Sequence, residues 1–165
     1  MKLYRVCKEN EGKTILETGE FSSLGSNYGN RNLNGFHYEP GKRYLHFFRY
    51  FSDIHYLNLC EGYFICEYDI PDELVPSPCY GSYMDYVSFK KPDEVEEYVI
   101  ESSQIKFEYL DEMNRILEYI DYEDYAYGDY APMIERVYKK DSGIKYEKKL
   151  PQNEWWKLFI IRKCY

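Results

Sequence analysis

Alternation of apolar and polar side chains predicts four short strands in the first hundred residues. The segments are residues 3–7, 44–48, 63–70 and 97–100. In the first of them, Leu3, Arg5 and Cys7 share one face of the strand. The third ends at Pro71, because proline has no backbone N–H to donate to a neighbouring strand.

A spacing of three and four residues predicts one long helix over residues 106–120. Its apolar positions are Phe107, Leu110, Met113, Leu117 and Ile120. Asp111 and Arg115, four residues apart, would form a supporting ion pair on this helix. Ser102 or Ser103 could cap its first turn.

The remaining segments give shorter or less regular predictions. Ser52 and Asp53 offer a cap for a short helix that would carry Ile54, Leu57 and Leu59. Loops are expected at 21–34 and 76–86, a turn at 72–75, and a final strand or short helix at 155–161. Strands with interspersed helices and no regular βαβ alternation predict an α+β fold rather than a doubly wound sheet.

We expect one domain, since 165 residues suffice to bury a core but rarely make two domains. Within it, residues 1–120 carry the predicted core. Residues 121–165 begin with an acidic, tyrosine-rich segment and end in the predicted strand or helix, which would pack on the core.

Composition points to a cytoplasmic protein. Hydrophobic residues make up 44%, yet the mean hydropathy is −0.68, because 21 tyrosines combine apolar rings with hydroxyl groups. No apolar run approaches the roughly 20 residues of a membrane span, and the N-terminus has no signal-peptide pattern. The five cysteines contain no C-x-x-C pair. Small buried thiols in a reducing compartment are expected, with metal ligation or disulfides as alternatives.

The net charge of −8 is unevenly distributed. Residues 93–135 hold fourteen acidic side chains against Lys106 and Arg115. Such a surface repels phosphate backbones, so we expect no direct nucleic-acid binding. It is either a solvated acidic face or a surface that attracts a basic protein.

Several separated segments carry the residues that hint at chemistry. They are Leu3-Tyr-Arg5, residues 35–48 ending in Tyr44-Leu-His-Phe-Phe48, Asp53-Ile-His-Tyr56, residues 63–75 and Glu97-Tyr-Val-Ile100. In this order they resemble the motifs of the ADP-ribosyltransferase-like superfamily over roughly the first 120 residues. The resemblance implies mixed or antiparallel sheets with a few peripheral helices. The chain departs from the arginine-directed members, because it has no Ser-Thr-Ser run and its Glu-x-Glu spacing falls at Glu94 and Glu96.

The resemblance implies a role for five side chains. They are Arg5, Tyr44 and Tyr56 as contacts to NAD, and His46 and Glu97 as catalytic residues. Glu97 would stabilise the ribosyl cation that forms as nicotinamide leaves. Neighbouring strand residues face opposite ways, so Glu96 is an alternative to Glu97 and cannot share its cleft. A buried Glu97 would need a charge partner, for which Arg5 is the natural choice.

Each of these residues also has a structural explanation. Arg5 could be an ion-pair partner, and a lone histidine among aromatic rings, such as His46, is commonly a hydrogen-bonded core residue. His37, beside a Pro-Gly turn, is expected to be exposed. Three histidines without helical i,i+4 spacing do not predict a metal site.

The expected function is therefore NAD-dependent ADP-ribosyl transfer to a protein acceptor. The alternative is a non-catalytic interaction or inhibitor protein that uses the acidic, tyrosine-rich surface of 93–135 to bind a basic site on a partner protein. A third possibility is a protein that binds a nucleotide without turning it over. None of these expectations involves a membrane.

Overall fold

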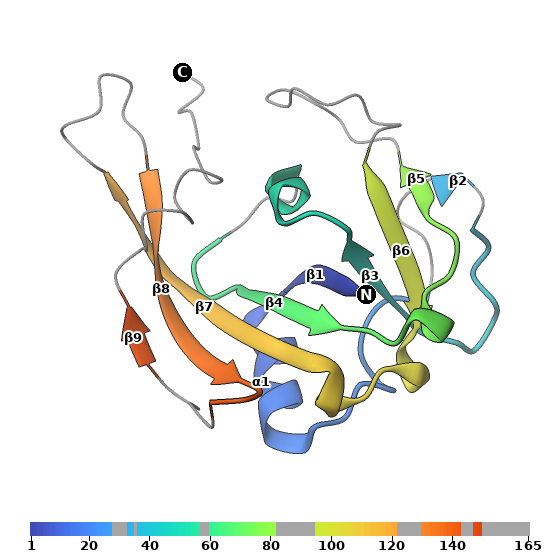
Figure 1. The fold of residues 1–165 in the computed structure, drawn as a ribbon, viewed down its shortest axis with the longest axis horizontal. Coiled ribbons are helices and arrows are strands. Elements are labelled where there is room, and N and C mark those ends of the chain that lie inside the picture. Colours follow the sequence, from blue (N-terminus) through green and yellow to red (C-terminus); the bar gives the residue numbers. More distant parts are fainter. Residues whose placement is uncertain are drawn as a thin grey trace.

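The structure is a computed structural model that describes residues 1–27, 33–34, 36–56, 60–81, 95–121, 130–142 and 147–149. Its strands form one antiparallel sheet in the order β2-β5-β6-β3-β1-β4-β7-β8-β9 (Figure 1). The elements in chain order are β1 (Lys2–Cys7), α1 (Glu9–Thr18), β2 (Leu33–Asn34), β3 (Tyr44–Phe48), η1 (Phe51–Tyr56), β4 (Phe64–Asp69), η2 (Asp72–Leu74), β5 (Cys79–Gly81), β6 (Glu96–Glu101), η4 (Ser102–Gln104), η5 (Phe107–Tyr109), β7 (Leu110–Asp121), β8 (Tyr130–Lys139) and β9 (Glu147–Lys149). The first strand along the chain thus lies at the centre of the sheet.

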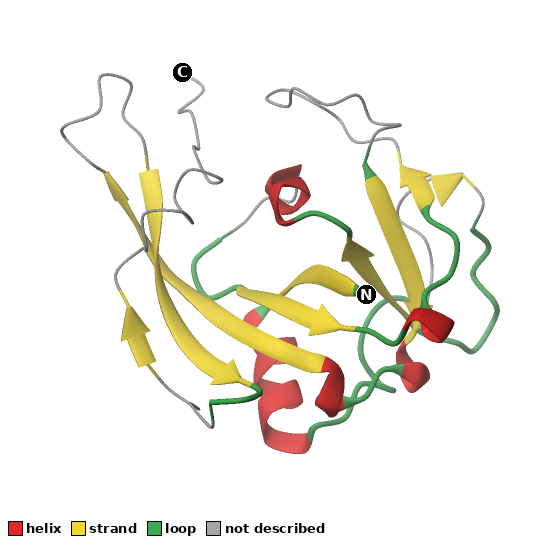
Figure 2. Cartoon of the chain, viewed as in Figure 1, coloured by secondary structure: helices red, strands yellow, loops and turns green. Residues whose placement is uncertain are grey.

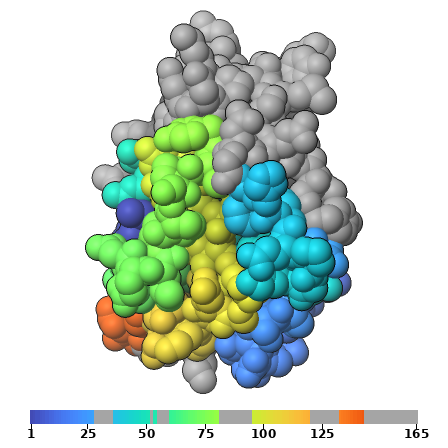
Figure 3. Space-filling model, turned by 90° about the vertical axis from the view of Figure 1, so that its right-hand side faces the viewer, coloured from blue at the N-terminus to red at the C-terminus, as the bar shows by residue number. Residues whose placement is uncertain are grey.

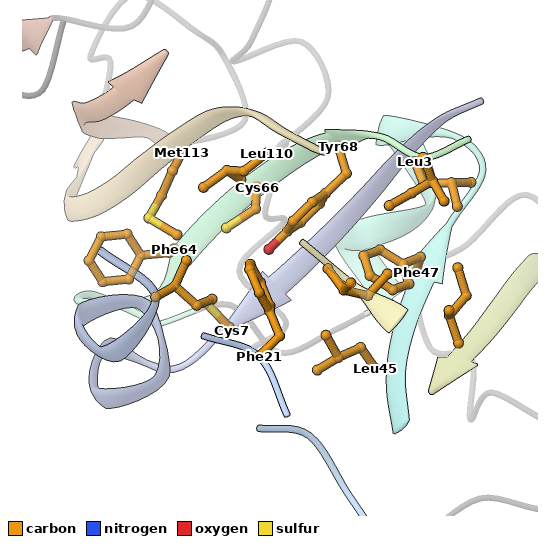
Figure 4. Packing of buried hydrophobic residues seen from close by; sticks show 14 of the residues in the cluster. Leu3, Cys7, Phe21, Leu45, Phe47, Phe64, Cys66, Tyr68, Leu110 and Met113 are labelled. Atoms are coloured by element: carbon orange, nitrogen blue, oxygen red, sulfur yellow. The ribbon is translucent and has the colours of Figure 1, made fainter. Parts of the chain in front are cut away.

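One face of the sheet, which we call the helix face, packs against α1. Leu3, Arg5 and Cys7 of β1 point to this face, as their alternation predicts. Its core also contains Phe21, Leu45, Phe47, Phe64, Cys66, Tyr68, Leu110 and Met113 (Figure 4). Apart from Phe21, which follows α1, these buried side chains come from β1, β3, β4 and β7, so the helix face forms the main core of the protein.

The opposite face, which we call the site face, is covered in part by the 3-10 helix η1 (Figure 2). Tyr4 of β1 pairs with Phe48 of β3, and both belong to a second apolar cluster with Ile54 of η1. The rings of Tyr4 and Phe51 meet edge to face, with centroids 5.5 Å apart. The central strands are therefore buried on both faces of the sheet.

The helix α1 was not among the predicted elements. Acidic Glu9 and Glu11 stand in its first turn, where the helix dipole favours negative charge. It ends at Gly19, whose φ of 68° is left-handed and whose N–H donates to the Ile15 carbonyl. Only Gly12 and Ile15 of its ten residues are buried. So thin an apolar stripe produces little periodic signal in the sequence.

The helix predicted over residues 106–120 is wrong, because β7 runs from Leu110 to Asp121. A bulge opposite Glu67 and Tyr68 inserts one residue after Leu110. It places Leu110 and Met113, three residues apart, on the same face of the sheet. Bulges and burial on both faces thus produced a spacing that is typical of a helix.

The strands predicted at 3–7, 44–48, 63–70 and 97–100 are confirmed as β1, β3, β4 and β6. The segment predicted as a loop at 76–86 contains the short strand β5, and η1 stands where a short helix was expected. Leu57, Leu59 and residues 155–161 lie outside the described residues. The α+β class holds at the coarse level of an antiparallel sheet with one α-helix.

The described residues after 120 extend the same sheet. β7 continues through Asp121, β8 pairs with it, and β9 pairs with β8. None of the helices in the described part of the chain is long and apolar enough to cross a membrane.

Candidate functional site

The strands β3 and β6 bring His46 and Glu97 together on the site face. The two strands pair in antiparallel register, with His46 opposite Val99 and Phe48 opposite Glu97. The His46 Nδ1 atom lies 2.6 Å from Glu97 Oε1, within hydrogen-bond distance. The Glu97 side chain is fully buried, whereas the His46 side chain keeps 18% of its surface exposed. His46 therefore stands between the buried carboxylate and the solvent.

The second ring nitrogen of His46 meets two hydroxyl groups. The Tyr38 hydroxyl lies 2.8 Å from Nε2, and the Ser26 hydroxyl lies 3.5 Å from it. An ionised carboxylate can only accept, so Nδ1 carries the proton that is donated to Glu97. In the neutral ring, Nε2 then has a lone pair and accepts a hydrogen bond from the Tyr38 hydroxyl.

The backbone around Ser26 is fixed against β3. Ser26 and Tyr44 exchange two backbone hydrogen bonds of 3.1 and 2.8 Å. Gly25 has a φ of 79°, and a Cβ at this position would lie 2.2 Å from the Tyr44 carbonyl oxygen. Only glycine fits so close to the strand, and it allows Ser26 to sit beside His46.

Aromatic rings border the site. Phe36, Tyr38 and Tyr44 pack edge to face with centroids between 4.9 and 5.5 Å apart. The Tyr38 ring also stacks on the His46 ring, with centroids 6.0 Å apart. The segment that carries Tyr38 and the segment that carries β5 flank β6 on one side of the molecule (Figure 3). These rings form an apolar border beside the polar pair.

Arg5 does not join this site. Tyr4 and Val6 lie in the site-face cluster, so Arg5 between them points to the helix face. There its guanidinium pairs with Glu11 of α1. Burial alone would lower the pKa of Arg5, and the nearby Glu11 carboxylate more than offsets this effect, so the pKa is raised. The expected pairing of Arg5 with Glu97 is wrong, because the two residues lie on opposite faces.

The other predicted residues are placed as follows. Tyr44 is buried, and its hydroxyl accepts a hydrogen bond from the Glu39 N–H at 3.4 Å. Tyr56 ends η1, and its side chain lies outside the described part of the chain. Glu96 points away from the site and accepts a hydrogen bond from the Tyr98 hydroxyl at 2.8 Å. The prediction that Glu96 and Glu97 face opposite ways is thus confirmed.

Cys79 of β5 lies directly opposite Glu97 in the sheet and is buried. Burial raises the pKa of its thiol, and the negative charge of Glu97 adds to the shift. A thiol with a raised pKa is a weak nucleophile. Cys79 therefore packs behind the carboxylate and does not supply a reactive thiolate.

Arg43 is a cation close to the site that the sequence motifs did not indicate. It stands at the start of β3, and its Nη1 donates a hydrogen bond of 3.0 Å to the Gly25 carbonyl. The side chain is exposed. Arg43 thus offers positive charge one residue away from Ser26.

The acidic side chains of 93–135 do not form one solvated face in the part that the structure describes. Glu97 and Glu135 are buried, and Glu112 lies 2.8 Å from Arg136. The strand β6 is separated from β7 by β3, β1 and β4. These carboxylates are therefore distributed over distant strands, while residues 122–129 lie outside the described ranges.

Sequence reasoning found His46 and Glu97 but missed Ser26, Tyr38 and Arg43. Ser26 stands in a Gly, Asn and Ser-rich segment whose composition indicates only a loop. Tyr38 is one of 21 tyrosines, so its residue type alone does not indicate a site. His37 is exposed, as expected.

The arrangement can accept and release a proton at His46 Nε2, with the resulting charge balanced by Glu97. Among the described residues, no group of three or more His, Cys, Asp and Glu side chains is arranged to hold a metal ion. Comparisons of the chain with protein-family models, curated proteins and solved structures find no match.

Proposed function

We propose that the protein transfers ADP-ribose from NAD and that His46 and Glu97 form the centre of its active site. One observation carries this proposal. His46 and Glu97 belong to separate sequence motifs, 51 residues apart, and the resemblance assigns both of them to the same chemistry. Their contact at 2.6 Å is what a shared site requires.

The charge of the pair suits the reaction. Positive charge develops on the ribose as nicotinamide leaves, and a fixed negative charge in a site of low dielectric stabilises it. Glu97 is fully buried and in contact with His46, so its charge acts on the substrate through His46. In this proposal His46 is the catalytic residue and Glu97 holds it in position.

The surroundings of the pair supply groups that NAD could use. The Tyr38 ring gives a surface on which nicotinamide can stack. The exposed guanidinium of Arg43 can bind the pyrophosphate in two N–H···O contacts. Arg43 would thus contact NAD in place of Arg5, the residue to which the sequence motif assigned this role. Arg5 instead forms an ion pair with Glu11.

The proposal is tested by release of nicotinamide from NAD. His46→Asn removes the proton-accepting nitrogen and keeps a side-chain N–H that can donate to Glu97. We expect the rate to fall by about 10²-fold or more, which is the usual contribution of a general base. The measurement is the initial rate of nicotinamide release, followed by chromatography, with the fold of each variant checked by circular dichroism.

His37→Asn is the matched control, because His37 is an exposed histidine nine residues earlier in the chain. Its rate should equal that of the wild type. Equal rates for His46→Asn and the wild type, or no release by the wild type under any condition tested, would contradict the proposal.

The alternative of a binding protein with an acidic surface has no specific observation in its favour. Among the described carboxylates between 93 and 135, Glu97 and Glu135 are buried and Glu112 pairs with Arg136. We retain the cytoplasm as the proposed location, since the buried thiols Cys7, Cys66 and Cys79 are free.

A further inference from the structure

We propose that the acceptor of the transferred group is a hydroxyl, namely that of a serine or tyrosine side chain of a protein, and that His46 Nε2 takes its proton. This inference rests on the proposed ADP-ribosyl transfer and specifies its acceptor. It follows from the tautomer of His46, from the groups that already meet Nε2, and from the chemistry of the competing acceptors.

The His46 tautomer with its proton on Nδ1 leaves Nε2 able to act as a base. Glu97 is fully buried, and its Oε1 lies 2.6 Å from Nδ1. This contact holds the proton on Nδ1 and leaves the lone pair on Nε2. The ring also orients Nε2 away from the buried carboxylate, toward the segments that carry Ser26 and Tyr38.

The groups that contact Nε2 in the structure are hydroxyl groups, the proposed class of acceptor. The phenol of Tyr38 lies 2.8 Å away and stacks its ring on the imidazole. The hydroxyl of Ser26 lies 3.5 Å away. Nε2 therefore makes the kind of contact that a tyrosine or serine hydroxyl can form, and both of these side chains are half-buried rather than sealed in the core.

Other acceptor groups fit the site less well. A hydroxyl is a weak nucleophile until a base takes its proton, so a positioned imidazole is useful to it. A carboxylate acceptor carries no proton to remove and would be repelled by Glu97. A guanidinium is far too weak an acid for an imidazole to deprotonate.

The acceptor oxygen forms a bond to the anomeric carbon of the ribose, and the bond from this carbon to the nicotinamide nitrogen breaks. The bonding electrons leave with nicotinamide, which becomes neutral. The hydroxyl proton moves to His46 Nε2, the resulting imidazolium is paired with Glu97, and the proton later passes to water.

The experiment uses the full chain with NAD alone, so that the protein's own side chains are the acceptors. Modified residues are located by fragmentation mass spectrometry, and the linkage is tested with neutral hydroxylamine, which cleaves esters of carboxylates. We expect modification of serine or tyrosine that resists hydroxylamine. We also expect at least about 10²-fold less modification in His46→Asn, and no change in His37→Asn.

The contrary outcomes separate the two proposals. Nicotinamide release with modification only of Asp, Glu, Arg or Cys, or with no modification of protein, overturns the acceptor class and leaves the proposed function standing. Absence of nicotinamide release overturns the proposed function and this inference with it.

A second measurement does not depend on turnover. Nitrogen-15 chemical shifts of the His46 ring in the full chain distinguish the two tautomers. A protonated Nδ1 with an unprotonated Nε2 is expected, and in Glu97→Gln the population of this tautomer should fall. A ring protonated on Nε2 in the wild type would overturn the inference whatever the activity.

Discussion

Replacing Glu97 by alanine is expected to lower the free energy of unfolding by about 3 kcal/mol. The side chain is fully buried and bonded to His46, so its removal leaves a cavity and an N–H donor without its acceptor. The measurement is urea unfolding followed by circular dichroism. The control is Glu101→Ala on the same strand, where the partly exposed carboxylate pairs with Lys42 at 3.3 Å. This variant should lose much less stability than Glu97→Ala, because ion pairs at the surface contribute little.

A double-mutant cycle isolates the pair from the other contacts of Glu97. His46→Ala, Glu97→Ala and the double variant are compared with the wild type. We expect a coupling energy of about 1 to 3 kcal/mol, because the two side chains are in direct contact. Additive losses would show that the pair contributes nothing to stability, and the site as described would then be wrong.

The variant Gly12→Ala is expected to destabilise the protein by about 2 kcal/mol, although alanine is the better helix former. A Cβ at Gly12 would lie 2.3 Å from the Phe64 ring, so α1 would have to move away from the sheet. Helix propensity alone predicts the opposite, a gain of about 1 kcal/mol. Thermal unfolding distinguishes the two, since they differ in sign.

A compensating variant tests the reason for this loss. Phe64→Leu removes the ring edge that the new methyl group would meet, at the cost of a cavity. Gly12→Ala combined with Phe64→Leu should therefore lose less stability than the sum of the single variants. A higher melting temperature for Gly12→Ala alone would show that α1 does not pack on Phe64 as described.

Periodicity predicted the central strands because their signal is local. Residues 3–7 alternate between two covered faces, and 63–70 end at a proline, so both were confirmed. It failed for β7, where bulges change the phase of alternation and Leu110 and Met113 acquire a helical spacing. It also missed α1, whose contact with the sheet depends on a glycine, a residue that carries no hydrophobic signal.

The site residues also divide into those that the sequence indicated and those that it missed. Motif resemblance selected His46 and Glu97, and the structure brings them into contact. The face to which Arg5 points follows from alternation, but its partner depends on α1, which had not been predicted. Ser26 and Tyr38 reach His46 through a segment before β3 whose path no local pattern encodes, so only the three-dimensional structure reveals them.

We expect NAD to bind at His46 on the site face, and calorimetric titration of NAD measures this binding without requiring turnover. Two variants are compared with the wild type. One is Arg43→Ala. The other combines Arg5→Met with Glu11→Leu and so removes both charges of the buried pair together. We predict that the wild type and the double variant bind NAD equally and that Arg43→Ala binds at least about tenfold more weakly, a loss of one charge-assisted contact. Absence of NAD binding by the wild type, or binding lost in the folded double variant and retained in Arg43→Ala, would contradict the account.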